Sequence, residues 1–197
     1  LGVEHDLVRG ESFYNDRLKD TEQRIEEAGL LEESEGAMVV DLEDQDMPPC
    51  LIRKSDGASL YATRDLASAI YRAEELHADL NLYVTGQEQD LHFKQIFAVL
   101  KKMKFPWAES CHHVSHGLYR CKDVGKMSSR KGQVIRLKDV LEKAISMVRK
   151  IIEEKNPDLE DKDIVARQVG VGAIIFNDLV NDRVKNVEFD WERVLDF

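Results

Sequence analysis

The sequence lacks long hydrophobic runs. No apolar segment approaches the roughly 20 residues that a membrane-spanning helix requires, and residues 1–20 contain no hydrophobic segment typical of a signal peptide. Cysteine is scarce too, because only Cys50, Cys111 and Cys121 are present, and three thiols cannot all pair with one another. Free thiols are typical of a reducing compartment. These absences predict a soluble protein of the cytoplasm with no membrane partner.

Several motifs of common enzymes are absent as well. There is no Walker A motif, no dinucleotide-binding fingerprint, no readable Ser-His-Asp arrangement and no internal repeat. Histidines and cysteines gather between residues 111 and 121, but structural zinc sites favour short paired spacings, which this cluster lacks. On a strand, the adjacent His112 and His113 would point to opposite faces. We therefore favour ordinary strand residues over a zinc site and predict no metal ligands here.

Negative charge dominates the composition. The 197 residues are 43% hydrophobic and 34% charged, with a net charge of -10, which is typical of a folded globular protein. Because phosphate contacts dominate nucleic-acid binding, an acidic chain predicts that any such contact is local. The acidic residues between 32 and 46 are expected to form a solvated surface. The chain begins at Leu1 and ends at Phe197 without a polar tail, which we interpret as a segment of a longer protein.

Hydrophobic periodicity predicts an α/β protein. Apolar residues at helical spacing indicate helices, and short apolar runs indicate strands. The expected helices cover residues 14–29, 66–77, 93–103, 140–152 and 164–179, and the expected strands cover residues 37–42, 50–53, 59–61, 80–85, 112–116 and 134–137. The nearly continuous apolar run at 80–85 is typical of a parallel strand that is buried on both faces. Thr63 is expected to cap the second helix.

The order of these elements divides the chain into three predicted regions. Residues 1–57 form a connecting region with one helix and short strands. Residues 58–137 alternate strand and helix, which is the pattern of half of a Rossmann-like doubly wound parallel sheet. Residues 138–197 form a helical appendage in which Phe189 and Trp191 are expected to pack. Half a sheet exposes an edge and apolar surface, so we expect the chain by itself to self-associate.

A basic loop stands out against the acidic background. Residues 125–132 read Gly-Lys-Met-Ser-Ser-Arg-Lys-Gly. Lysine and arginine can neutralise phosphate oxygens, and the hydroxyls and exposed amides can donate hydrogen bonds to them. A solvated surface turn is the alternative for these residue types alone. The position of the loop, after a strand–helix–strand–helix–strand run, favours a phosphate-binding loop.

Tyr61 and Asp65 form a second candidate site. They are four residues apart, so both side chains share one face if the helix begins one turn before the expected cap. A carboxylate can accept two parallel hydrogen bonds from a guanidinium, and a phenol can accept a third. The alternative is that Asp65 only caps its helix while Tyr61 packs in the core.

The third candidate site follows the strand at 80–85. Gly86 ends this strand, and a polar segment leads into the next helix. Open α/β sheets bind ligands at such strand ends. Here Glu88 could hold ribose hydroxyls and Gln89 could bind a polar substrate. An ordinary polar loop remains the alternative when this segment is considered alone.

Four segments, in this order, resemble the arginyl-tRNA synthetase family within the class I aminoacyl-tRNA synthetases. They are residues 10–16 (GESFYND), 55–58 (SDGA), 61–67 (YATRDLA) and 125–132 (GKMSSRKG). Residues 126–130 are similar to the Lys-Met-Ser-Lys-Ser signature of the class, and residues 86–89 to its Gly-x-Asp-Gln nucleotide motif. The similarity extends over essentially the whole chain.

The resemblance implies ATP-dependent activation of L-arginine to arginyl-adenylate and transfer to tRNA(Arg), with ATP and Mg²⁺ as cofactors. It implies that Tyr61, Asp65 and Gln89 bind arginine and that residues 138–197 form a connector that contacts the tRNA stem. The implied ATP-binding residues are Gly86, Glu88, His92, His116, Lys126, Met127, Ser128 and Ser129, and the implied catalytic residues are Lys126, Ser128 and Lys131.

The sequence departs from the family pattern in two places. Ser129 replaces the second lysine of the signature, so Arg130 or Lys131 would have to supply that charge. The other phosphate motif of the family, His-x-Gly-His, is absent, and residues 112–116 do not match it. We therefore expect the isolated chain to be inactive. The parent enzyme is expected to be a monomer. The alternatives are a related enzyme with another substrate and a non-catalytic synthetase-like binding module.

Overall fold

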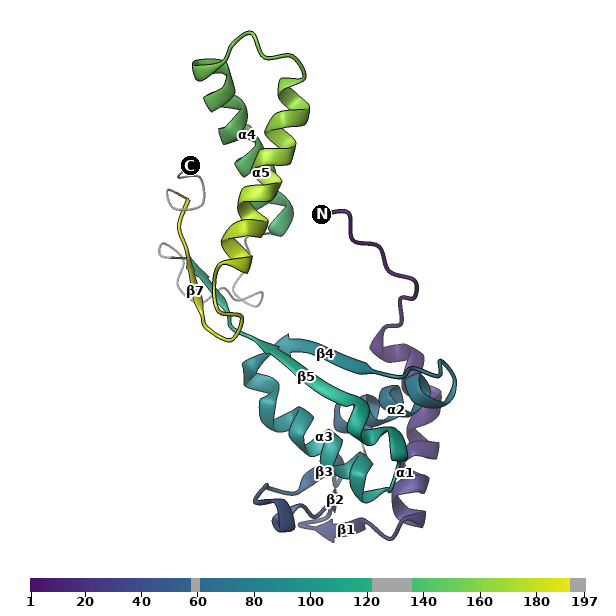
Figure 1. Cartoon of the computed structure of the whole chain (residues 1–197). Coiled ribbons are helices and arrows are strands. Elements are labelled where there is room, and N and C mark those ends of the chain that lie inside the picture. Colours follow the sequence, from purple (N-terminus) through teal and green to yellow (C-terminus); the bar gives the residue numbers. More distant parts are fainter. Residues whose placement is uncertain (58–60, 122–135, 192–197) are drawn as a thin grey trace. The chain divides into compact units, whose positions relative to one another are not determined.

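The computed structural model describes residues 1–57, 61–121 and 136–191 (Figure 1). The chain divides into two compact units. One comprises Val3–Ser115, and the other comprises His116–Phe197 together with Leu1–Gly2. Each unit has its own arrangement of helices and strands.

The first unit, Val3–Ser115, begins with helices and a small antiparallel sheet. The 3-10 helix η1 (Glu11–Arg17) runs into α1 (Leu18–Glu27), which buries Leu18 and Ile25. The strands β1 (Leu31–Ser34), β2 (Ala37–Val40) and β3 (Cys50–Arg53) then pair antiparallel in the order β1-β2-β3. The 3-10 turn η2 (Glu43–Gln45) lies between β2 and β3. The predicted strands at 37–42 and 50–53 are confirmed, whereas β1 was not predicted.

The same unit continues with alternating helices and strands. In order, these are α2 (Tyr61–Glu74), β4 (Asn81–Gly86), the 3-10 turn η3 (Gln87–Gln89), α3 (Asp90–Lys102), the 3-10 turn η4 (Pro106–Ser110) and β5 (Cys111–His116). Strands β4 and β5 are neighbours in a two-stranded sheet and run in the same direction (Figure 1). This part of the chain therefore has the α/β pattern of a partial parallel sheet.

One hydrophobic core joins the two halves of this unit. Ile25 of α1 and Ile52 of β3 belong to the same buried cluster as Leu66 of α2, Ile96 of α3 and Cys111 of β5. Residues on both sides of the predicted boundary at residue 57 therefore pack in one core.

Strand β4 differs from its prediction. Its inward side chains are buried, and the Tyr83 ring lies 5.0 Å from the ring of Phe93 in α3. On its other face, Leu82 is 54% exposed and Val84 66% exposed. The prediction of a strand buried on both faces is wrong for this chain, because only one face is covered by described residues.

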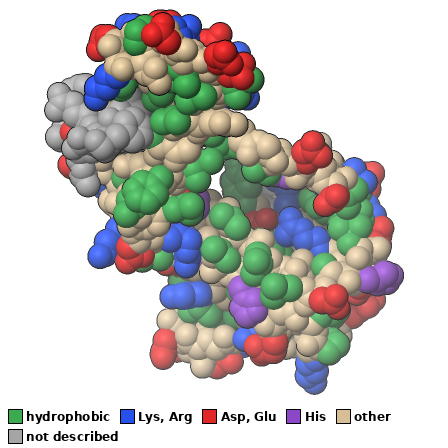
Figure 2. Space-filling view, turned by 45° about the horizontal axis from the view of Figure 1, so that its top comes forward, with side chains coloured by type: hydrophobic (Ala, Val, Ile, Leu, Met, Phe, Trp, Pro, Cys, Tyr) green, Lys and Arg blue, Asp and Glu red, His purple; other side chains and the backbone are tan. Residues whose placement is uncertain are grey.

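The second unit contains a pair of long helices, α4 (Leu137–Lys155) and α5 (Lys162–Leu179). Ala144 and Val148 of α4 are buried with Ala166 and Ala173 of α5. The short strands β6 (Tyr119–Cys121) and β7 (Val187–Phe189) pair parallel, and the ring of Phe189 lies 4.9 Å from that of Trp191. Figure 2 shows hydrophobic side chains at the surface of this unit and charged ones around the loop that joins its helices.

The predicted helices at 140–152 and 164–179 are confirmed, but α4 begins earlier than expected. The prediction of a strand at 134–137 is wrong at Leu137, which is the first residue of α4; residues 134 and 135 lie outside the described ranges. None of the described helices is long and apolar enough to cross a membrane.

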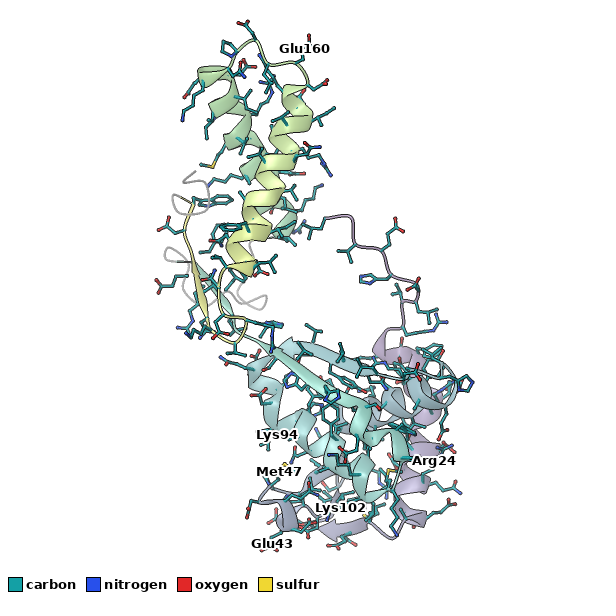
Figure 3. The ribbon with its side chains drawn as sticks, in the orientation of Figure 1. Arg24, Glu43, Met47, Lys94, Lys102 and Glu160 are labelled. Atoms are coloured by element: carbon teal, nitrogen blue, oxygen red, sulfur yellow. The ribbon has the colours of Figure 1, made fainter. Side chains whose placement is uncertain are left out.

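Ion pairs join neighbouring elements at the surface of each unit, and Figure 3 labels Arg24 and Lys102, which take part in two of them. Arg24 of α1 bonds Glu74 of α2 at 2.8 Å, and the ammonium group of Lys102 lies 2.7 Å from Asp44. In the second unit, Arg149 of α4 bonds Asp163 of α5 at 2.7 Å. Exposed pairs of this kind contribute little individually, so the buried clusters account for most of the stability.

Candidate functional site

The start of α2 places Tyr61 and Asp65 together. Tyr61 was expected in a strand and Thr63 at the helix cap, but α2 already begins at Tyr61. Thr63 is instead fully buried, and its hydroxyl donates a 2.6 Å hydrogen bond to the carbonyl oxygen of Ile52 in β3. This bond fixes the first turn of α2 against the antiparallel sheet. Because the helix begins one turn early, Tyr61 and Asp65 lie on one face of it.

A cavity of about 510 Å³ brings four of the predicted site residues together. Its lining includes Tyr61 and Asp65 of α2, Gln89 of η3 and His92 of α3. Residues that are up to 31 positions apart in the sequence thus line one site within the first unit. The cavity opens beside the exposed face of β4, since Leu82 and Val84 also line it.

His92 contacts Asp65 directly. The Nε2 atom of His92 lies 2.6 Å from Oδ2 of Asp65, and both side chains are partly buried. Since a carboxylate only accepts hydrogen bonds, Nε2 carries the proton and donates it. The resemblance placed His92 beside the nucleotide, whereas the fold places it on the carboxylate assigned to arginine.

Two charged residues of this cavity were not predicted. Glu11 of η1 and Arg72 of α2 also line it. Glu11 stands in the 10–16 segment that carried the family resemblance, which is the one signal that could have identified it. The guanidinium of Arg72 lies 5.0 Å from the ring centre of Tyr83, and burial raises the pKa of the Tyr83 hydroxyl to about 12, although nearby Arg72 opposes this shift.

The turn between β4 and α3 carries Gly86, Glu88 and Gln89. A Cβ atom at Gly86 would lie only 2.4 Å from a carboxylate oxygen of Glu88. The carboxylate therefore folds back over the glycine, and any larger residue at position 86 would displace it. Gln89 is the last residue of η3 and faces the cavity, so one short segment bears both a predicted nucleotide contact and a predicted arginine contact.

The other predicted residues belong to the second unit or lie outside the described ranges. His116 belongs to the second unit, where its Nδ1–H donates a 2.8 Å hydrogen bond to the carbonyl oxygen of Gly117. The basic loop, with Lys126, Met127, Ser128, Ser129 and Lys131, lies in residues 122–135, outside the described ranges.

The described part of the chain contains neither a cluster of metal ligands nor a thiol that is reactive near neutral pH. Within it, no three His, Cys, Asp or Glu side chains are grouped so as to hold a metal ion. Cys50 and Cys111 are free thiols in the core. Burial raises the pKa of Cys50 to about 12 and that of Cys111 above its usual value, so both stay protonated and unreactive near neutral pH.

Comparison of the sequence with known proteins finds relatives that belong to one family. Residues 2–191 match the family described as "tRNA synthetases class I (R), catalytic domain". The chain is 55% identical over its whole length to Arginine--tRNA ligase 1 of Bacillus thuringiensis and 49% identical to Arginine--tRNA ligase of Clostridium acetobutylicum. It covers 35% of each, so it spans about a third of the length of these curated relatives.

Solved structures share the fold. The arginyl-tRNA synthetase of Plasmodium falciparum superposes with a TM-score of 0.81 at 24% identity, over 98% of this chain and 33% of that one. The Thermus thermophilus arginyl-tRNA synthetase superposes with a TM-score of 0.77 at 22% identity, over 90% of this chain and 36% of that one. The predicted partial Rossmann-like α/β architecture is thereby confirmed.

Proposed function

The chain belongs to the class I tRNA synthetase (R) catalytic-domain family, and on that premise we propose that it supplies part of the site that activates L-arginine with ATP and transfers it to tRNA(Arg). The observation that carries this proposal is the shared cavity of Tyr61, Asp65, Gln89 and His92. Three of these four residues are the arginine ligands expected from the sequence.

The chemistry of the cavity fits a guanidinium group. A carboxylate accepts two parallel hydrogen bonds from the planar donors of arginine, which an ammonium group cannot supply in the same geometry. Asp65 is the proposed partner, with the Tyr61 hydroxyl as a further acceptor. Glu11 in the same cavity adds a second negative charge. The paired, planar contact with Asp65 would favour arginine over lysine, whereas the negative charges would attract either cation.

His92 would orient the carboxylate of Asp65. Its ring lies 5.1 Å from the ring of Phe93, which limits its movement. Each carboxylate oxygen has two lone pairs, so Oδ2 can accept a hydrogen bond from His92 and still accept one from a guanidinium. His92 therefore fits the arginine side of the site, and Gln89 beside it would bind the polar groups of the amino acid.

The nucleotide side would use Gly86, Glu88 and His116 together with the basic loop. In adenylation, a carboxylate oxygen of arginine attacks the α-phosphorus of ATP in line with the departing pyrophosphate. The protein positions the reactants and neutralises the developing charge, a role that we assign to Lys126, Ser128 and Lys131. Met127 and Ser129 would complete the loop, and the Glu88 carboxylate would bind ribose hydroxyls.

Mg²⁺ would enter bound to ATP. Among the described residues no group of three ligands could hold the ion, and Mg²⁺ in nucleotide sites commonly keeps its place through substrate phosphates. When bound, it would neutralise phosphate charge.

We place the activity in the cytoplasm, since Cys50 and Cys111 are free thiols, and we propose a monomeric parent enzyme.

Activity should require more than these 197 residues. The His-x-Gly-His motif that supplies the opposing phosphate contacts in the family does not occur in this sequence. A chimera in which the chain replaces the matching 35% of the Bacillus thuringiensis relative supplies the rest. We expect the chimera to charge tRNA(Arg) with arginine, whereas the chain alone gives no arginine-dependent ATP–pyrophosphate exchange in the presence of tRNA.

A non-catalytic synthetase-like binding module is the second candidate, because the same motif is absent. Charging assays on the chimera separate the two. An inactive chimera that is folded and binds no arginine would favour the binding module, and charging with another amino acid would overturn the arginine assignment.

A further inference from the structure

The imidazole of His113 connects the two residues that flank the turn between β4 and α3. Thr85 immediately precedes residues 86–89 and Asp90 immediately follows them. The Nε2 atom of His113 lies 2.8 Å from Oγ1 of Thr85, and its Nδ1 atom lies 3.0 Å from Oδ1 of Asp90. One side chain of β5 thus contacts both ends of a four-residue segment. We call these three residues the His113 bridge.

The hydrogen-bonding roles follow from the acceptors. The carboxylate of Asp90 only accepts, so Nδ1 carries a proton and donates it. In the neutral imidazole, Nε2 then accepts the proton of the Thr85 hydroxyl. Both ring nitrogens are therefore satisfied by residues that are five positions apart in the sequence.

The bridge is held in a rigid setting. The His113 side chain is only 11% exposed, and its ring lies 4.7 Å from the ring of Phe93, tilted by 32°. His112, its neighbour on β5, is exposed on the opposite face. The difference between these adjacent histidines distinguishes a packed, doubly bonded imidazole from an ordinary surface side chain.

We propose that His113 is a positioning residue for the aminoacylation site: by bonding Thr85 and Asp90 it fixes the segment 86–89, and thereby the placement of Glu88 and Gln89. Thr85, Gln89 and Phe93 all line the cavity, so a displaced turn changes the cavity directly. The inference rests on the proposed function for its kinetic consequence. The structural part concerns this chain alone.

The structural part can be tested by hydrogen exchange on the 197-residue chain. His113→Ala should raise the exchange rates of the amides at 87–90 about tenfold or more, since the partly buried Thr85 hydroxyl and the Asp90 carboxylate both lose their bonds to the imidazole. The matched control His112→Ala should leave these amides unchanged, and the amides of β2 should not respond to either variant. Unchanged protection at 87–90 in His113→Ala would overturn the bridge, whatever the function of the protein.

The kinetic part can be tested in the chimera with milder variants that keep the fold. His113→Asn can replace only the Nδ1 contact, and Thr85→Val removes the hydroxyl from the other side. Each change should lower kcat/KM for arginine about tenfold, chiefly through a higher KM, and the double variant should be no worse than either single variant. Thr85→Ser, which keeps the hydroxyl, should lose much less than Thr85→Val.

Multiplicative losses in the double variant, or a full loss in Thr85→Ser, would contradict the positioning role. Should the unsubstituted chimera show no arginine activity, the proposed function fails, while the hydrogen-exchange result still decides the bridge. Loss of thermal stability without any change in KM would assign His113 to packing alone and overturn the proposal.

Discussion

Burial at single residues sets how this chain responds to pH. The thiol of Cys50 lies in the shared core of the first unit, and burial raises its pKa to about 12. An exposed thiol in the unfolded chain ionises near pH 8.5. The folded state therefore holds a proton that the unfolded state releases as pH rises, and stability that is fully present below about pH 8.5 is lost on the way to pH 12.

Cys50→Ala should weaken this dependence. Between pH 8.5 and 10 the free energy of unfolding of the parent chain should fall by about 1.6 kcal/mol through this thiol, and the variant should lack that share of the decline while being less stable at pH 7. Urea unfolding at pH 7, 8.5 and 10 provides the measurement. Equal slopes in both proteins would show that Cys50 does not control this range.

Some residues of the candidate site could be predicted from the sequence and others could not. That Tyr61, Asp65 and Gln89 belong together could be predicted because their types and order match a recognisable pattern, and the three line one cavity. The hydrogen bond between His92 and Asp65 could not be predicted. The two residues are 27 positions apart, and only the packing of α2 against α3 brings them into contact. Glu11 was missed for the same reason, since it reaches the cavity from η1.

At the scale of elements, amphipathic helices and most strands were predictable, but the short strand β1 and the start of α2 were not. Helices α4 and α5 have apolar residues at helical spacing over four turns or more, which is a strong signal. Strand β1 is only four residues long, and its acidic side chains face solvent, so only pairing with β2 reveals it. The start of α2 was misplaced because Thr63 is bonded to β3 rather than to its own helix.

The contact between α4 and α5 gives a matched pair of glycine variants. A Cβ atom at Gly170 would lie 2.8 Å from the backbone nitrogen of Ile145, whereas one at Gly172 would meet nothing within 4 Å. Gly170→Ala should therefore destabilise the chain by about 1–3 kcal/mol. Gly172→Ala should stabilise it by about 0.5–1 kcal/mol, because alanine suits a helix better. Thermal melts of both variants test this, and equal effects would contradict the close packing.

For the whole molecule, uncovered apolar surface is the main consequence of the fold. Leu82 and Val84 form an exposed apolar face on β4, and the chain covers only about a third of its relatives' length. We expect the 197-residue chain to self-associate through this face despite its charge of -10.

Replacing both residues with threonine should shift the chain towards monomer. The double variant Leu82→Thr/Val84→Thr places β-branched threonine, which suits a strand, at both positions and removes most of the apolar surface. A matched double variant, Val3→Thr/Val8→Thr, alters even more exposed residues outside the strand and should associate like the parent. Light scattering after size-exclusion chromatography measures the mass. Association that persists in the β4 variant would place the contact elsewhere.

The central claim is that the cavity of the first unit recognises arginine through Asp65, and the KM for arginine of the Asp65→Asn chimera tests it most directly. Asparagine keeps the shape and removes the charge, so losing charge-assisted hydrogen bonds should raise this KM about 10- to 100-fold. The KM for ATP should stay unchanged, as should both constants in the exposed control Asp79→Asn. An unchanged arginine KM in the Asp65→Asn chimera would contradict the account.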